Sequence, residues 1–124
     1  MKRFLKDSKG ASAVELAMTA PLYMAVLFGV AQTGLALWTQ LGIEHGAEMA
    51  ARCASINPST CSSASATQNY AVSESFGLSI PASTFSLATP ACGNQVSASY
   101  VYSFITLVFG TPHVTLTARS CFPK

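Results

Sequence analysis

The chain has 124 residues, of which 50% are hydrophobic and only 10% are charged. It is too short for two ordinary domains and too apolar for a disordered chain. Four of the seven basic residues lie within positions 1–10, so removal of that segment, which also contains Asp7, leaves three basic residues against four glutamates. Because little positive charge then remains to contact phosphate groups, the composition argues against nucleic-acid binding.

A basic leader, residues 1–10, precedes an apolar run that extends from Leu16 to Ile43. As a helix, the part from Leu16 to Trp38 would be about 33 Å long, close to the thickness of the hydrocarbon layer of a membrane. The run lacks the small-residue cleavage site that follows a conventional secretory signal. The positive charge ahead of the run predicts a transmembrane helix with its N-terminus in the cytoplasm and the following residues exported.

Glu15 is a solitary acid at the head of this run. A charge costs about 2.5–3.5 kcal/mol at the centre of a membrane helix and less near its end, so such residues usually have a partner and a function. Cleavage between Gly10 and Ala11 would create an amine one helical turn before Glu15, within reach of a carboxylate in the same or a neighbouring chain. The alternative is that Glu15 simply lies at the water interface, where a helix N-terminus favours an acid.

The helical pattern continues beyond the apolar run until Asn57-Pro58-Ser59 ends it. We therefore expect one helix from about Ser12 to about Ser55. Within it, the spacing of Gly42, Gly46 and Ala50 places small residues on one face, which allows close backbone approach. Packing of this face against a sheet is favoured over helix dimerisation.

The remaining residues carry signals for one short helix and several strands. Ala64–Gly77 predicts a second helix with Gly77 at its end. Alternation of polar and apolar residues predicts strands at Ser83–Leu87, Gln95–Tyr102 and His113–Arg119. The expected fold class is therefore α+β, with a long N-terminal helix, a short second helix and an antiparallel sheet of about three strands packed on the long helix.

Three segments follow as the expected domain organisation. Residues 1–10 are expected to form a cytoplasmic leader, residues 11–40 a transmembrane helix, and residues 41–124 an exported domain. The four cysteines, Cys53, Cys61, Cys92 and Cys121, all fall in the exported part, where an oxidising compartment allows disulfides to persist.

The spacing of these cysteines favours disulfides over a metal site. Neither the pair Cys53 and Cys61 nor the pair Cys92 and Cys121 has the compact spacing of a zinc-binding C-x-x-C. Four cysteines allow three pairings, and proximity in the sequence favours Cys53–Cys61 with Cys92–Cys121. No metal ion or other cofactor is expected.

The two histidines, His45 and His113, belong to different predicted elements, and no hydrolase or metalloprotease motif accompanies them. We therefore expect no catalytic residue and no enzymatic activity.

A second apolar segment lies between the last two predicted strands. It is too short to span a bilayer, so a buried connection over the core is favoured. The alternative is an apolar protrusion that contacts another subunit or the membrane surface. Its apolar residues form a candidate interaction patch: Phe104, Ile105, Leu107, Val108 and Phe109.

The segment Lys9-Gly10-Ala11-Ser12-Ala13-Val14-Glu15-Leu16-Ala17, followed by Pro21 and the apolar run, resembles the processing site of class III signal peptides in type IV pilin-like proteins. With Gly34 near the end of the run, an alanine-rich helix through Arg52 and a late strand, the whole chain is similar to TadE-like pseudopilins of tight-adherence (Tad) pilus systems. Leu16 stands where the family usually has an aromatic residue, and an arginine often found near the end of the membrane segment is absent.

This resemblance implies a minor pilin or pseudopilin that a prepilin peptidase cuts after Gly10, with Ala11 and Glu15 acting in assembly. The implied partners are the inner membrane, the peptidase, other pilin or pseudopilin subunits and the assembly platform of Tad/Flp pili, with adhesion or secretion as the outcome. The exported domain would be periplasmic or extracellular. A main filament subunit is disfavoured because Flp-type major pilins are little more than the helix. The alternative from another class is an uncleaved, single-pass, membrane-anchored periplasmic binding domain.

Overall fold

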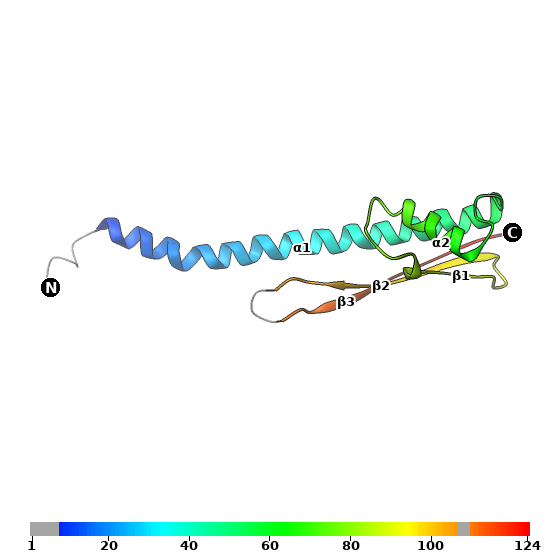
Figure 1. The fold of residues 1–124 in the computed structure, drawn as a ribbon. Helices are drawn as coiled ribbons and strands as arrows, with labels where there is room; N and C mark the ends of the chain where they lie inside the picture. The colour runs from blue at the N-terminus through cyan, green and yellow to red at the C-terminus, as the bar shows by residue number, and fades with distance from the viewer. Residues whose placement is uncertain (1–7, 107–109) are drawn as a thin grey trace. The chain divides into compact units, whose positions relative to one another are not determined.

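The computed structural model describes residues 8–106 and 110–124, with side chains from Gly10 onward. The elements follow one another along the chain in the order shown in Figure 1: α1 (Ser8–Ile56), α2 (Ala64–Ser73), the short 3₁₀ helix η2 (Ala82–Thr84), β1 (Phe85–Ala88), β2 (Asn94–Ser103) and β3 (His113–Phe122). The expected α+β fold is therefore confirmed.

The chain divides into two compact units, Met1–Gly34 and Leu35–Lys124, and α1 contributes residues to both. The expected leader lies outside the described residues, apart from the start of α1 at Ser8. Helix α1 continues through Pro21 without interruption. It ends at Ile56, where the Asn57 amide still donates to the carbonyl of Cys53 at 2.8 Å but Pro58 cannot continue the pattern.

The sheet of the second unit is antiparallel, with strand order β1-β2-β3. Strand β1 begins at Phe85, later than expected, because Ala82–Thr84 forms η2. Strand β3 extends beyond the expected end at Arg119 to Phe122, which pairs with Asn94 at the start of β2. The side-chain Nδ2 of Asn94 also donates to the backbone carbonyl of Ala54 in α1 at 3.1 Å, so this end of the sheet is joined to the helix.

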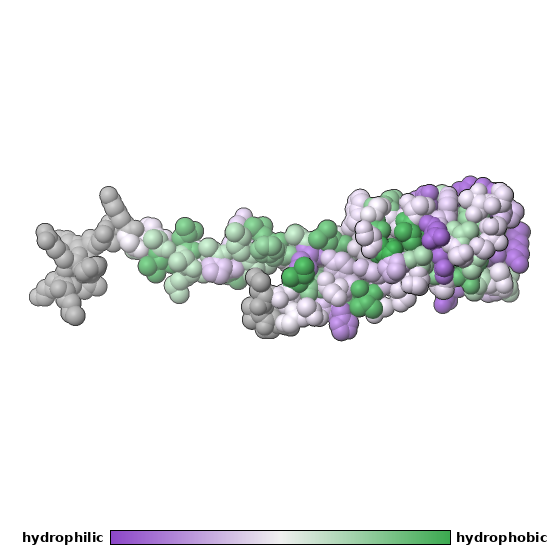
Figure 2. Space-filling view, viewed as in Figure 1, coloured by the Kyte–Doolittle hydropathy of each residue, from purple (hydrophilic) through white to green (hydrophobic). Residues whose placement is uncertain are grey.

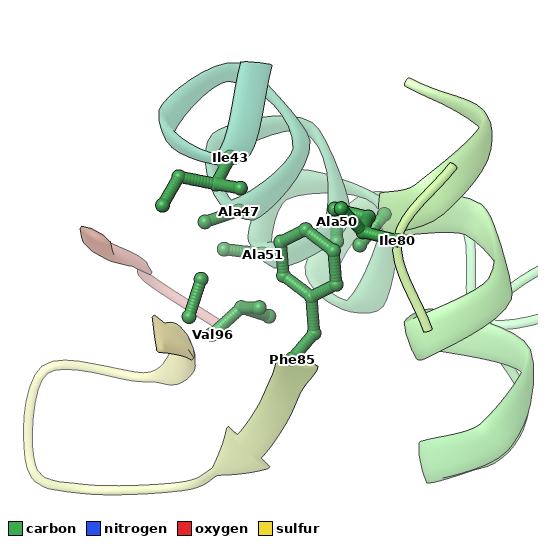
Figure 3. Close-up of a cluster of buried hydrophobic side chains, with 9 residues drawn as sticks. Ile43, Ala47, Ala50, Ala51, Ile80, Phe85 and Val96 are labelled. Carbon is green, nitrogen blue, oxygen red and sulfur yellow. The ribbon is translucent and has the colours of Figure 1, made fainter. Parts of the chain in front are cut away.

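The core of the second unit forms around the ring of Phe85, which is fully buried. Figure 3 shows this ring directed towards Ala47, Ala50 and Ala51 of α1, with Ile80 beside it. Small side chains on the helix leave room for the ring, and burial of a phenylalanine contributes about 1.5–3 kcal/mol. The sheet therefore packs on α1, as expected.

The glycine face of α1 packs against the end of α2, the turn that follows α2, and the Phe85 ring of β1. A Cβ atom on Gly46 would lie 2.6 Å from the carbonyl oxygen of Ala71 and 3.2 Å from the Phe85 ring of β1, and one on Gly42 would lie 2.5 Å from the side chain of Leu78. The sheet thus covers part of this face, as expected, and the residues from Ala71 to Leu78 cover the rest. Because residues of the same chain cover both glycines, the face is not free to form a helix dimer.

Helix α2 ends at Ser73, four residues before the expected end at Gly77. Its start is capped by Ser63, whose hydroxyl accepts from the Ala66 amide at 3.2 Å. Beyond the helix, Phe76 and Gly77 adopt positive φ angles of 53° and 73°, which no helix can include. Gly77 therefore belongs to a separate tight turn rather than to the helix terminus.

Both disulfides connect the cysteines that proximity in the sequence favoured. Cys53 at the end of α1 bonds Cys61, and Cys92 before β2 bonds Cys121 in β3, with Cα atoms 5.9 and 6.4 Å apart. The first closes the loop that leaves α1, and the second fastens the last strand to the turn before β2.

Replacement of Gly46 by alanine should destabilise the second unit. The new Cβ atom would approach the Ala71 carbonyl too closely, so α2 must shift, and overpacking of this kind costs about 1–3 kcal/mol. Urea unfolding of the detergent-solubilised full chain, followed by tyrosine circular dichroism, measures the change. Gly34→Ala is the matched control, because a Cβ atom there meets nothing within 4 Å. Equal midpoints for the two variants would contradict the packing described here.

Removal of the two disulfides should have unequal effects. The loops span 8 and 29 residues, and the cost of closing a loop in the unfolded chain grows with its length. The variant C92A/C121A should therefore lose about 1 kcal/mol more stability than C53A/C61A, within a typical range of about 2–4 kcal/mol per disulfide. Urea midpoints of the two double variants test this order, and a larger loss in C53A/C61A would overturn it.

Candidate functional site

The residues expected to act in processing and assembly all lie on the part of α1 that belongs to the first unit. Gly10, Ala11 and Glu15 are exposed in one continuous helix. Ala11 and Glu15 are four residues apart, so they lie on the same face with a rise of about 6 Å between them. The geometry therefore allows a carboxylate at Glu15 to meet a cation at the level of Ala11.

The side chains around Glu15 are apolar and exposed. Val14 and Leu16 are 61% and 67% exposed, and exposure continues along the helix through Phe28 and Val30. Figure 2 shows green, apolar residues predominating on the visible surface of this part of α1. By length and composition, α1 from Gly10 onward could cross a membrane, and none of its most apolar stretch is buried within the described chain. A long, apolar, unburied helix fits a membrane anchor.

Threonine hydroxyls within this helix are satisfied by its own backbone. Thr19 donates to the carbonyl of Glu15 at 3.0 Å, and Thr33 donates to that of Gly29 at 2.8 Å. Such bonds let a hydroxyl lie in an apolar environment without water. Glu15 differs from these residues because a backbone carbonyl can accept a hydrogen bond from a hydroxyl but cannot neutralise the charge of a carboxylate.

The candidate interaction patch is described only in part. Ile105 is 78% exposed, and the half-buried Phe104 ring stands edge-on to Tyr102 with ring centroids 5.1 Å apart. Leu107, Val108 and Phe109 lie outside the described residues. The interpretation as a buried connection therefore does not hold for Ile105.

Neither histidine lies in a cluster of metal-binding side chains within the part of the chain that the structure describes. His45 lies with Nδ1 2.8 Å from the backbone carbonyl of Glu74 and stacks on the ring of Phe76 at 4.7 Å. His113 is exposed at the start of β3. All four cysteines are in disulfides, and no group of three or more histidine, cysteine, aspartate or glutamate residues is placed to hold a metal ion within residues 10–106 and 110–124.

A small cavity of about 210 Å³ lies between the end of α1 and α2. Arg52 is the one charged residue that lines it, beside Met49, Ile56 and Tyr70. Its volume is below the range of about 300–1,000 Å³ that is usual for small-molecule sites. The cavity therefore gives no particular support to a ligand-binding function.

One exposed cluster was not predicted from the sequence. Phe76 contacts both His45 and Trp38, and the centroids of the Trp38 and Phe76 rings are 5.7 Å apart. The only local sequence signal for this cluster is the pair Phe76-Gly77, and a glycine in that position is typical of a helix end. Contact with Trp38 depends on the packing of α2 against α1, which a local pattern does not reveal.

Comparison with known protein families supports the resemblance. A sequence model of the family described as TadE-like protein matches residues 10–52, which begin at Gly10 and include Glu15 and the glycine face of α1. No curated protein and no solved structure matches the chain. The resemblance inferred from the sequence is thus confirmed over residues 10–52, where this chain is similar to TadE-like proteins.

Proposed function

We propose that this protein is a pilin-like structural subunit, a minor pilin or pseudopilin that acts in the assembly of Tad/Flp pili, with adhesion or secretion as the cellular outcome. The observation that carries the proposal is the exposed apolar part of α1 with a solitary acid, Glu15, at its head. The TadE-like match over the same residues supports it.

The proposed pathway begins with a precursor in the inner membrane. Residues 1–10 remain in the cytoplasm, α1 crosses the bilayer, and the second unit is exported, in agreement with the positive charge of the leader. A prepilin peptidase cuts after Gly10. The new amine of Ala11 is then a cation beside the apolar helix, one turn before Glu15.

In this proposal Glu15 forms an ion pair with the amine of Ala11, in an adjacent subunit displaced along the helix axis. Within lipid or a bundle of apolar helices, an unpaired carboxylate is costly, and pairing with an amine removes much of that cost. The pair would fix the register between neighbouring helices, because apolar side chains alone allow them to slide. Other pilin or pseudopilin subunits and the assembly platform are the proposed partners.

Replacement of Glu15 by alanine tests this role. The variant should insert into the membrane at the normal level, since it is more apolar than the natural chain, but it should leave the amine of Ala11 unpaired. Removal of one partner of a buried pair costs about 3–5 kcal/mol, so we expect surface pili to fall at least about tenfold. Electron microscopy counts the pili, and immunoblots of membranes measure insertion.

Glu48→Ala is the matched control, because Glu48 is an exposed acid on the second unit's part of the same helix. This variant should retain normal piliation. Normal piliation in Glu15→Ala would refute the assembly role and would favour an uncleaved membrane-anchored domain instead.

A further inference from the structure

The turn that follows α2 holds an aromatic side chain in an unfavourable backbone conformation. Leu78 donates its amide to the carbonyl of Ser75 at 3.1 Å, and the two central residues, Phe76 and Gly77, both have positive φ. Turns of this kind usually have asparagine, aspartate or glycine at both central positions. A bulky residue at such a φ is strained, and strain of this kind tends to occur where a residue has a function.

Packing inside the second unit does not explain why a phenylalanine stands at this strained position. Its side chain is 48% exposed, although it contacts the rings of Trp38 and His45. Trp38 is itself 53% exposed, and Leu41 lies one turn further along the same face of α1 and is 57% exposed. Trp38, Leu41 and Phe76 therefore form a continuous exposed surface, the apolar rim, although α1 and α2 are distant in sequence.

Charge is absent from the rim itself. The charged residues nearest to it along the chain are Glu44 and Glu74, both acidic. An acidic surround does not favour an anionic partner, so any attraction must come from the apolar side chains. Tryptophan is enriched at the interface between membrane and water, and phenylalanine and leucine form the buried face of helices that lie in that interface.

The position of the rim along the chain indicates its occupant. Trp38 lies within the apolar run of α1, about 33 Å after Leu16, a length close to the thickness of the hydrocarbon layer. We propose that the rim lies in the lipid headgroup layer, so that Phe76 is a second membrane contact of the exported unit, in addition to α1. This inference rests on the proposed membrane insertion of α1. The contact would hold the exported unit at the bilayer surface until assembly begins.

Fluorescence of the full chain in phosphatidylcholine vesicles tests this contact. Trp38 is the only tryptophan, so W38F provides a silent background into which a probe can be placed. In W38F/F76W, lipids brominated high on their acyl chains should reduce emission at least about twofold, because the probe would lie at headgroup level. Aqueous iodide should quench the emission of this probe only weakly. Added salt should change neither the quenching by lipid nor the quenching by iodide.

The matched control is W38F/I56W. Ile56 is 59% exposed and lies at the far end of α1, about 27 Å from Trp38 along the axis, so iodide but not brominated lipid should quench it. If the turn does not accept tryptophan, W38F/L41W reports on the same rim without altering the turn.

Native Trp38 separates failure of this inference from failure of the proposed function. Quenching of Trp38 by brominated lipid, together with iodide quenching of the Phe76→Trp probe, would overturn the rim contact and leave membrane insertion standing. A Phe76→Trp probe shielded from both quenchers would indicate a protein partner and would also overturn it. Absence of lipid quenching at Trp38 would overturn both proposals.

Discussion

The structure depends on one constraint, which is that the apolar first part of α1 lacks a partner within the described chain. Each large apolar side chain left in water forgoes about 1.5–3 kcal/mol of burial, and this segment exposes many of them. A bilayer or the helices of neighbouring subunits can supply that burial. The same apolar surroundings that stabilise these side chains penalise Glu15, so the acid needs a cation where the helix is inserted.

Helix α1 changes its composition where its environment changes. Large side chains such as Met18 and Phe28 cover the exposed part, whereas glycine and alanine line the part that packs inside the second unit. Small residues allow α2 and the Phe85 ring to approach the helix backbone closely. Because this core is small, two disulfides complement it by restricting the unfolded chain. One helix can thus serve as an anchor and as the base of a folded domain.

Features determined by local pattern were predicted well. The apolar run, the alternation of β2 and the turn residues around it report directly on neighbouring positions, so the α+β fold followed from them. Features that depend on contacts between residues distant in the sequence were predicted poorly. The end of α2 and the partner of Gly46 depend on how α2 packs on α1, and Phe76 was missed because its conformation opposes its local preference. Glu15, proposed to act in assembly, was identifiable because a solitary acid in an apolar run is a signal within one helical turn.

The central claim is that Glu15 is retained because proteolysis creates a cation for it to meet. Intact-mass measurement of the protein extracted from membranes of piliated cells tests this claim most directly. The account predicts a mature chain that begins at Ala11 and lacks residues 1–10. A protein that still begins at Met1 in cells with normal pili would contradict it, because the amine proposed to pair with Glu15 would then never form.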